Sequence, residues 1–359
     1  FGSAYSPSFD ARSTALSYSS YQIYRKLGIW PTLAQRSCPI RQIHVSERGR
    51  FGSTLLQAED YHWEAMGYVV ENAWLGTALI QALHEQDRVV MRSPTRVEQV
   101  ESFAGGYRLQ VDQGEAINAD LLVVADGADS QLRQNLGIDV ERRAYDQHAL
   151  IANIGHASDH RGCAYERFTD QGPLAMLPLL PDATGQHRSA LVWTLPEAEH
   201  ALLKECSEAE FLGQLQRRFG YRLGRLLKMG ERFSYPLSLV QAREQVRHNL
   251  VLLGNAAHSL HPVAGQGFNL ALRDCAALAE VLSAAGSRGD DLGELAVLQS
   301  YMDGQQADQE RTVNFSDQLP GLFAHPDPAL SRLRDMGLFA LDLSPALKRQ
   351  FVRQAAGVS

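Results

Sequence analysis

An apolar run, a glycine-containing loop and an amphipathic helical pattern follow one another over residues 250–285. The run at 250–253 has the length and composition of a buried strand and ends in Gly254-Asn255, and Gly265-Gln266-Gly267 precedes the helical pattern. Glycine lets a ligand approach the backbone closely, and the free N–H groups of a helix N-terminus attract negative charge. The segment predicts a binding loop at the carboxyl end of a strand. A tight turn without a ligand explains the glycines equally well.

A second apolar run, at residues 119–125, ends in Asp126-Gly127. A continuous apolar strand is typical of a sheet covered on both faces, as in α/β folds. Asp-Gly alone is a common turn sequence. Together with Gly254-Asn255, however, it indicates that two buried strands end in polar turns, the position where open α/β sheets bind ligands.

The residues between these strands have a different pattern. Strands are predicted near 147–155, 163–169, 174–180, 189–195 and 231–239, mostly without intervening helices, which indicates a largely antiparallel sheet. One helix is predicted within this region, because Ser207 and Glu210 have the spacing of a capping box. Before it, we expect a helix that ends at Gly28, a hairpin over 40–56, a helix over 74–86 and two strands over 96–111.

Several segments resemble one family. Residues 9–16 (FDARSTAL), 165–178 (YERFTDQGPLAMLP) and 261–270 (HPVAGQGFNL), with Asp126-Gly127 and Gly254-Asn255, resemble the flavoprotein aromatic hydroxylases related to para-hydroxybenzoate hydroxylase. The closer similarity is to the FAD-dependent hydroxylases of ubiquinone biosynthesis. Asn255-Ala256-Ala257 most resembles the branch that acts on 2-octaprenyl-6-methoxyphenol.

The resemblance implies a mixed α/β (α+β) fold with a Rossmann-like FAD-binding domain and an inserted, largely antiparallel substrate domain. No G-x-G-x-x-G occurs in the sequence, which begins where the family has completed its first βαβ unit, so we expect an N-terminally truncated domain that provides only the flavin-ring half of an FAD site. The expected boundaries are 1–38, 62–140 and 247–300 for the FAD-binding domain, 39–61 and 141–246 for the substrate domain, and 301–359 for a C-terminal helical region.

Site residues follow from the family's motifs. The carbonyl of Pro262 would face the reactive side of the flavin, and it is the one catalytic group that we name. The residues expected to bind the cofactor are Arg12, Asp126, Gly127, Gly254, Asn255, Gly265, Gln266, Gly267, Phe268 and Asn269. Asn255 replaces the family's usual aspartate, so it can still hydrogen-bond but brings no charge.

The implied reaction is the reduction of FAD by NADPH or NADH, followed by transfer of one oxygen atom from O2 to the ring of a polyprenylated phenol. The alternative is a non-catalytic flavin-fold subunit or an inactive fragment in an assembly of biosynthetic enzymes. We also expect a homo-oligomer or a biosynthetic complex as partner.

Composition and missing motifs exclude other classes. A net charge of −7 argues against a nucleic-acid-binding protein. Four widely separated cysteines argue against a zinc or redox dithiol site, and His258 and His261 lack neighbouring ligands, so we predict no metal site. Neither a membrane-spanning run nor a secretory signal is present, so we expect a cytoplasmic protein.

The C-terminal residues 331–359 carry a net charge of +3, from five basic and two acidic side chains. Together with the apolar residues 338–343, they favour either a peripheral contact with the inner face of the cytoplasmic membrane or packing against the protein core. Both interpretations fit the sequence.

Overall fold

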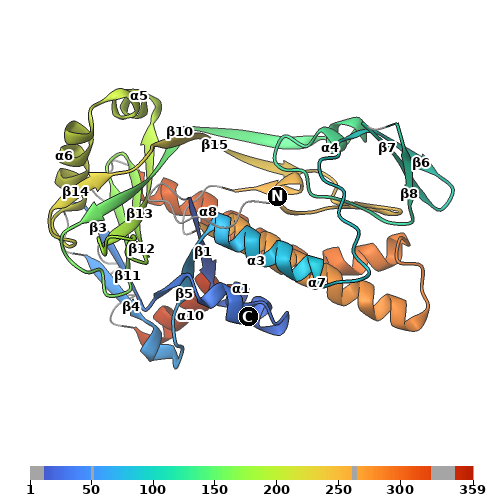
Figure 1. Ribbon diagram of the computed structural model, residues 1–359, viewed down its shortest axis with the longest axis horizontal. Helices are drawn as coiled ribbons and strands as arrows, with labels where there is room; N and C mark the ends of the chain where they lie inside the picture. Colours follow the sequence, from blue (N-terminus) through green and yellow to red (C-terminus); the bar gives the residue numbers. More distant parts are fainter. Residues whose placement is uncertain (1–11, 50–51, 113, 261–264, 325–343, 359) are drawn as a thin grey trace.

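The computed structural model describes residues 12–49, 52–112, 114–260, 265–324 and 344–358. It has a mixed α/β fold with mostly antiparallel sheets, as predicted. Figure 1 shows a large sheet with its helices at one end, a small sheet at the other, and long helices and strands that connect them.

The large sheet has nine strands in the order β18-β15-β10-β13-β12-β11-β3-β4, with β14 also paired to β10. Their bounds are β3 Gln42–Glu47, β4 Ser53–Gln57, β10 Val140–His156, β11 Cys163–Thr169, β12 Gly172–Leu179, β13 Arg188–Pro196, β14 Leu226–Met229, β15 Phe233–Ala242 and β18 His258–Ser259. All described pairs are antiparallel except β11 with β3, which are parallel. The antiparallel sheet and the hairpin formed by β3 and β4 are thus confirmed.

Two helices cover one face of this sheet, α5 (Glu197–Glu205) and α6 (Glu208–Phe219). The capping box of Ser207 and Glu210 is present at the start of α6, as predicted. The prediction of one helix in this region is wrong, because α5 precedes α6. Since α5 follows β13 directly and its N-cap, Pro196, makes no side-chain hydrogen bond, the sequence has no capping signal there. The core beneath includes Trp193 and Phe211.

A three-stranded sheet, β1-β5-β2, lies beside the large one. Its strands are β1 Ser13–Ser17, β2 Ser37–Ile40 and β5 Gly67–Glu71, and the adjoining helices are α1 Tyr18–Lys26, α2 Trp30–Ala34, α3 Asn72–His84 and the 3-10 turn η1 Ala58–Tyr61. The predicted helix at 74–86 corresponds to α3. The predicted helix end at Gly28 is also confirmed, because that residue has a φ of 73° just after α1.

Two further three-stranded sheets complete the fold: β6-β7-β8 and β16-β17-β9. Their strands are β6 Val97–Phe103, β7 Gly106–Val111, β8 Ala116–Ala119, β9 Leu122–Val124, β16 Val246–Arg247 and β17 Leu250–Leu252. All of β17 is buried, as expected. The expectation that the run ending at Asp126 is covered on both faces is wrong, because Val123 is 40% exposed. In the described part of the chain β9 is an edge strand, and its outer face stays open.

Long helices follow β17. These are α7 (Gln266–Arg288), α8 (Leu295–Ala324) and α10 (Pro345–Ala356). On α10, Val352 is buried in a cluster with Leu56 and Val69, so this helix packs against the core. Residues 338–343, which formed the apolar part of the membrane prediction, lie outside the described residues. Among the helices that the structure describes, none combines the length and apolar character required to cross a bilayer.

A buried ion pair joins the small sheet to the large one. Glu71 ends β5 and Arg188 begins β13, and their Oε1 and Nη2 atoms lie 2.6 Å apart. The two side chains are 8% and 6% exposed. Arg188 Nε also donates to the carbonyl of Leu180 at 2.8 Å. Removing one partner of such a pair leaves a charge buried without compensation.

We therefore expect Glu71→Gln to lower the free energy of unfolding by about 3 kcal/mol. The matched control is Asp170→Asn, which breaks the exposed pair with Arg48 at 3.2 Å and should cost about 1 kcal/mol or less. Urea denaturation measures both. Equal effects of the two substitutions would contradict a joining role for the buried pair.

Candidate functional site

The two polar turns predicted from the sequence lie at the same edge of one sheet. Strands β9 and β17 are parallel, with Leu252 opposite Val124, and the N–H of Leu253 donates to the carbonyl of Val124 at 2.9 Å. Asp126-Gly127 follows one strand and Gly254-Asn255 the other. Asp126 and Asn255 are both exposed. The edge therefore presents a carboxylate and an amide to solvent side by side.

Arg133 connects the two turns. It lies on the short helix α4 (Gln131–Asn135) and is 2% exposed. Its Nη1 donates to the carbonyl of Ala256 at 2.8 Å, and its Nη2 to the carbonyl of Ala128 at 2.9 Å. Desolvation lowers the pKa of Arg133, an effect that nearby Asp126 opposes. The guanidinium thus stabilises the relative position of the turns, a role that the sequence did not reveal.

The start of α7 forms the third wall of the site. Gly265 is its N-cap with a φ of 62°, and no side chain of the described residues caps the helix. The N–H groups of the first turn therefore keep hydrogen-bonding capacity for a ligand. Gly254 also has a positive φ, 59°, at the end of β17. Two left-handed glycines and the start of a helix of 23 residues suit a ligand that carries negative charge.

Asn269 holds this loop from beneath. The side chain is 1% exposed, and its Oδ1 accepts from the N–H of Ser17 at 2.8 Å and from the hydroxyl of Ser20 at 2.6 Å. Its Nδ2 donates to the carbonyls of Ala15 at 2.9 Å and Gly265 at 2.7 Å. These four bonds use the hydrogen-bonding groups of the amide. Asn269 thus fixes the conformation of Gly265 against β1 and α1.

The other sequence-predicted residues have different positions. Gln266 is 3% exposed and donates to the carbonyl of Ala355 on α10 at 3.1 Å, whereas Phe268 is 39% exposed. Arg12 is exposed, and its Nη1 donates to the hydroxyl of Tyr235 on β15 at 2.8 Å. Pro262, the one catalytic group named from the sequence, lies outside the described residues.

A buried polar pair beneath the loop was missed from the sequence. His258 and Asp274 are 2% and 0% exposed, and Nε2 of the histidine lies 2.6 Å from Oδ2 of the aspartate. The other oxygen of Asp274 accepts from the side chains of Gln305 at 3.0 Å and Gln309 at 3.3 Å. Interpreted from sequence as an ordinary loop residue, His258 instead belongs to a network that joins β18, α7 and α8. His261 lies outside the described residues.

Gln266, the first residue of α7, also lines a cleft of about 1180 Å³. Aromatic side chains of α8 and of the segment at the end of η1 line it, together with basic side chains of α7 and α10; among them are Tyr61, Trp63, Phe315, Arg273 and Arg353. The cleft therefore combines an apolar wall with a basic rim next to the loop.

Known proteins resemble this chain in sequence and in fold. The profile of the FAD binding domain family matches residues 4–316. The chain is 36% identical to the ubiquinone hydroxylase UbiL of Rhodospirillum rubrum, over 97% of this chain and 80% of the relative. It is 32% identical to the 3-demethoxyubiquinol 3-hydroxylase of Escherichia coli, over 97% and 88%. The crystal structure of PqsL from Pseudomonas aeruginosa with 2-aminobenzoylacetate has the same fold, with a TM-score of 0.76 at 22% identity, covering 92% and 89% of the two chains.

The loop glycines can be tested as a matched pair. Gly265→Ala places a side chain at a φ of 62°, so we expect the free energy of unfolding to fall by about 1–2 kcal/mol. Among the residues that the structure describes, an added Cβ at Gly267 meets nothing closer than Leu260 Cβ at 4.0 Å, and alanine is the better helix former. Gly267→Ala should therefore leave the free energy of unfolding unchanged or higher.

The same two variants distinguish an effect on FAD affinity from an effect on the free energy of unfolding. Because the added methyl group of Gly267→Ala would stand where a flavin approaches the backbone, we expect its affinity for FAD to fall by about tenfold, roughly 1.4 kcal/mol. Titration of the apoprotein with FAD, followed by fluorescence, measures this change. Unchanged affinity in Gly267→Ala would remove Gly267 from the cofactor site.

Proposed function

The chain belongs to the family of FAD-dependent hydroxylases of ubiquinone biosynthesis, and on that basis we propose that it hydroxylates the ring of a polyprenylated phenol of the 2-octaprenyl-6-methoxyphenol type, with NADPH as the reductant. The observation that carries the proposal is the uncapped start of α7, held opposite two parallel strand ends that Arg133 connects. This arrangement offers backbone donors and left-handed glycines rather than an acid–base pair, as expected where a cofactor supplies the chemistry.

We assign the flavin to this edge of the sheet. The first-turn N–H groups of α7 would bind the pyrimidine edge of the ring, Asn255 would hydrogen-bond the hydroxylated chain of the cofactor, and Asp126 would lie near its junction with NADPH. Arg12, which directly precedes β1, would flank the cofactor while Tyr235 orients its guanidinium. When bound, FAD supplies the activation of O2, and the protein binds, orients and excludes water.

The side chains that line the cleft next to Gln266 suit an extended substrate with apolar and polar parts. Tyr61 and Trp63 have ring centroids 5.3 Å apart, and both line the cleft with Phe315. Such a wall suits an isoprenoid chain, because apolar contact provides most of its binding energy. Gln266 contributes to both the loop and the cleft, so a substrate held there would lie beside the flavin site.

Activity can be tested with the purified full-length protein and a short-chain prenyl methoxyphenol. We expect substrate-dependent oxidation of NADPH and a product that has gained one oxygen atom, detected by mass spectrometry. Asn255→Leu removes a hydrogen bond of about 1 kcal/mol and should weaken FAD binding roughly fivefold, whereas Asn255→Asp retains an acceptor and should bind FAD well. The control is Asn314→Leu on the exposed face of α8.

The results discriminate between two functions. A protein that no added FAD can reconstitute and that oxidises no NADPH would favour the non-catalytic subunit. A protein that binds FAD and oxidises NADPH but leaves the phenol unchanged would retain the family assignment and overturn the substrate class.

We also propose a peripheral membrane contact through α10, which would suit a polyprenylated substrate. Arg349 and Arg353 lie one turn apart on this helix, and both are exposed at the basic rim of the cleft. A basic residue near an anionic bilayer contributes about 1 kcal/mol.

The double variant Arg349→Gln with Arg353→Gln should bind vesicles containing anionic phospholipid more weakly, by about tenfold or more. Co-sedimentation measures this, and Arg92→Gln with Arg108→Gln, on and beside the distant β6-β7-β8 sheet, is the charge-matched control. Substitution is preferable to truncation, because Val352 belongs to the core. Equal sedimentation of both double variants would remove the membrane contact.

A further inference from the structure

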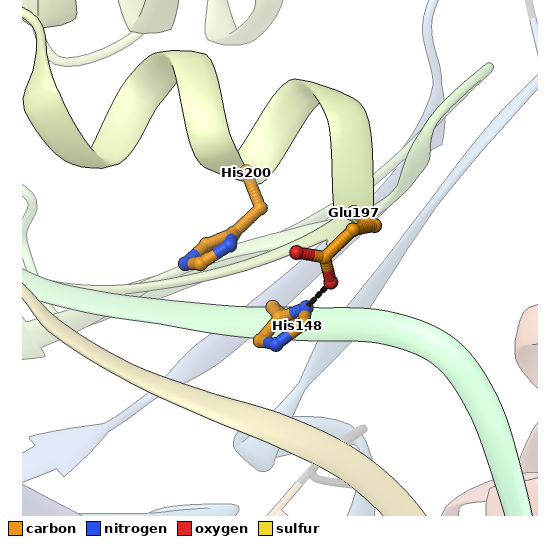
Figure 2. A group of neighbouring side chains, drawn as sticks. All are labelled: His148, Glu197 and His200. Carbon is orange, nitrogen blue, oxygen red and sulfur yellow. Dashed lines mark ion pairs between the residues drawn. The ribbon is translucent and has the colours of Figure 1, made fainter.

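A cluster of two histidines and a glutamate lies on the large sheet, away from the loop that begins α7. His148 lies on β10, and Glu197 and His200 lie on α5. Because Glu197 and His200 are three positions apart on a helix, they share one face. Figure 2 shows both pointing toward His148. This cluster could not be predicted from the sequence, because His148 lies 49 residues before Glu197 and α5 itself was not predicted.

We propose that His148, Glu197 and His200 form a binding site for one divalent transition-metal ion of the zinc type. Each residue offers one ligand atom, and these three atoms lie within 4.8 Å of one another. Nδ1 of His148 lies 2.9 Å from Oε2 of Glu197. The two imidazole rings are stacked, with centroids 4.2 Å apart and planes 8° apart. To bind one ion between their nitrogens, the rings of His148 and His200 would have to tilt. The three side chains are therefore already neighbours before the ion binds, but the orientation of the rings changes on binding.

The environment of His200 favours metal binding. The side chain is 6% exposed, and its Nδ1 has no hydrogen-bond partner among the described residues. A buried polar atom without a partner costs about 1–3 kcal/mol, so its presence calls for an explanation. Burial, followed by the charge of His148, lowers the pKa of His200, which favours the neutral imidazole that metals bind.

Ser234 provides the outer contact that metal-binding histidines usually have. Nε2 of His200 lies 2.5 Å from Oγ of Ser234 on β15. When Nε2 carries the proton and donates it to this hydroxyl, Nδ1 is unprotonated and its lone pair is free. Such a contact fixes the tautomer of a metal ligand.

The ligand set indicates the class of ion. Two imidazoles and one carboxylate are a common zinc set that leaves a coordination position open, and imidazole suits zinc, copper and nickel rather than magnesium or calcium. Glu197 has a 69% exposed side chain, so an ion can enter from solvent. The bound ion would link α5 to β10.

The test is equilibrium dialysis or calorimetric titration of the untagged protein, stripped of metal, with Zn²⁺. We expect one ion per chain and no comparable binding of Mg²⁺. Glu197→Gln, His148→Gln and His200→Gln should each weaken Zn²⁺ binding by about tenfold or more, and Ser234→Ala by about tenfold. Zn²⁺ should also raise the melting temperature of the unsubstituted protein, because the ion binds the folded chain.

Two substitutions serve as matched controls. Glu205→Gln removes a carboxylate from the exposed end of α5, and His84→Gln removes an exposed imidazole from α3. Both should bind Zn²⁺ like the unsubstituted protein. The proposal is overturned if no ion binds stoichiometrically, or if Glu197→Gln binds as tightly as Glu205→Gln. Because Glu197 is exposed, its substitution does not endanger the fold, and none of these readouts depends on FAD or on hydroxylation.

Discussion

The guanidinium of Arg133 lies between two parallel strands whose ends carry the polar turns of the site. It satisfies the carbonyls of Ala128 and Ala256, which would otherwise be left without these donors near the buried start of the loop. Because an arginine remains charged when buried and donates in fixed directions, it holds two backbone segments at a set distance. The exposed side chains of Asp126 and Asn255 owe their relative positions to this contact.

The loop at the start of α7 separates ligand binding from structural support. Asn269 and the pair of His258 and Asp274 form their hydrogen bonds below the loop, with β1, α1 and α8. The backbone N–H groups of the first helical turn stay available above it. A preorganised site of this kind binds a planar anionic group without first breaking internal bonds.

Local signals explain what could be predicted from the sequence. The capping box at Ser207, the hairpin around residue 48 and the glycines near α7 each act over a few residues, so their patterns are visible in the chain. The role of Arg133 depends on a partner 123 residues away, and α5 begins without a capping side chain, so neither was visible. The site residues drawn from the family's motifs, Pro262 and Arg12 among them, stay predictions, because no ligand contact tests them.

One strand joins the two ends of the molecule. With 17 residues, β10 spans about 55 Å. At one end, Glu141 pairs with Gln241 on β15, and Gln241 in turn pairs with His258 on β18, just before the loop. Its other end lies in the large sheet beside β13 and β14. The sheet and the residues that precede the loop therefore form one hydrogen-bonded body, as Figure 1 illustrates. Because β10 belongs to both parts, a displacement of the sheet would be transmitted along its backbone to the residues that precede the loop.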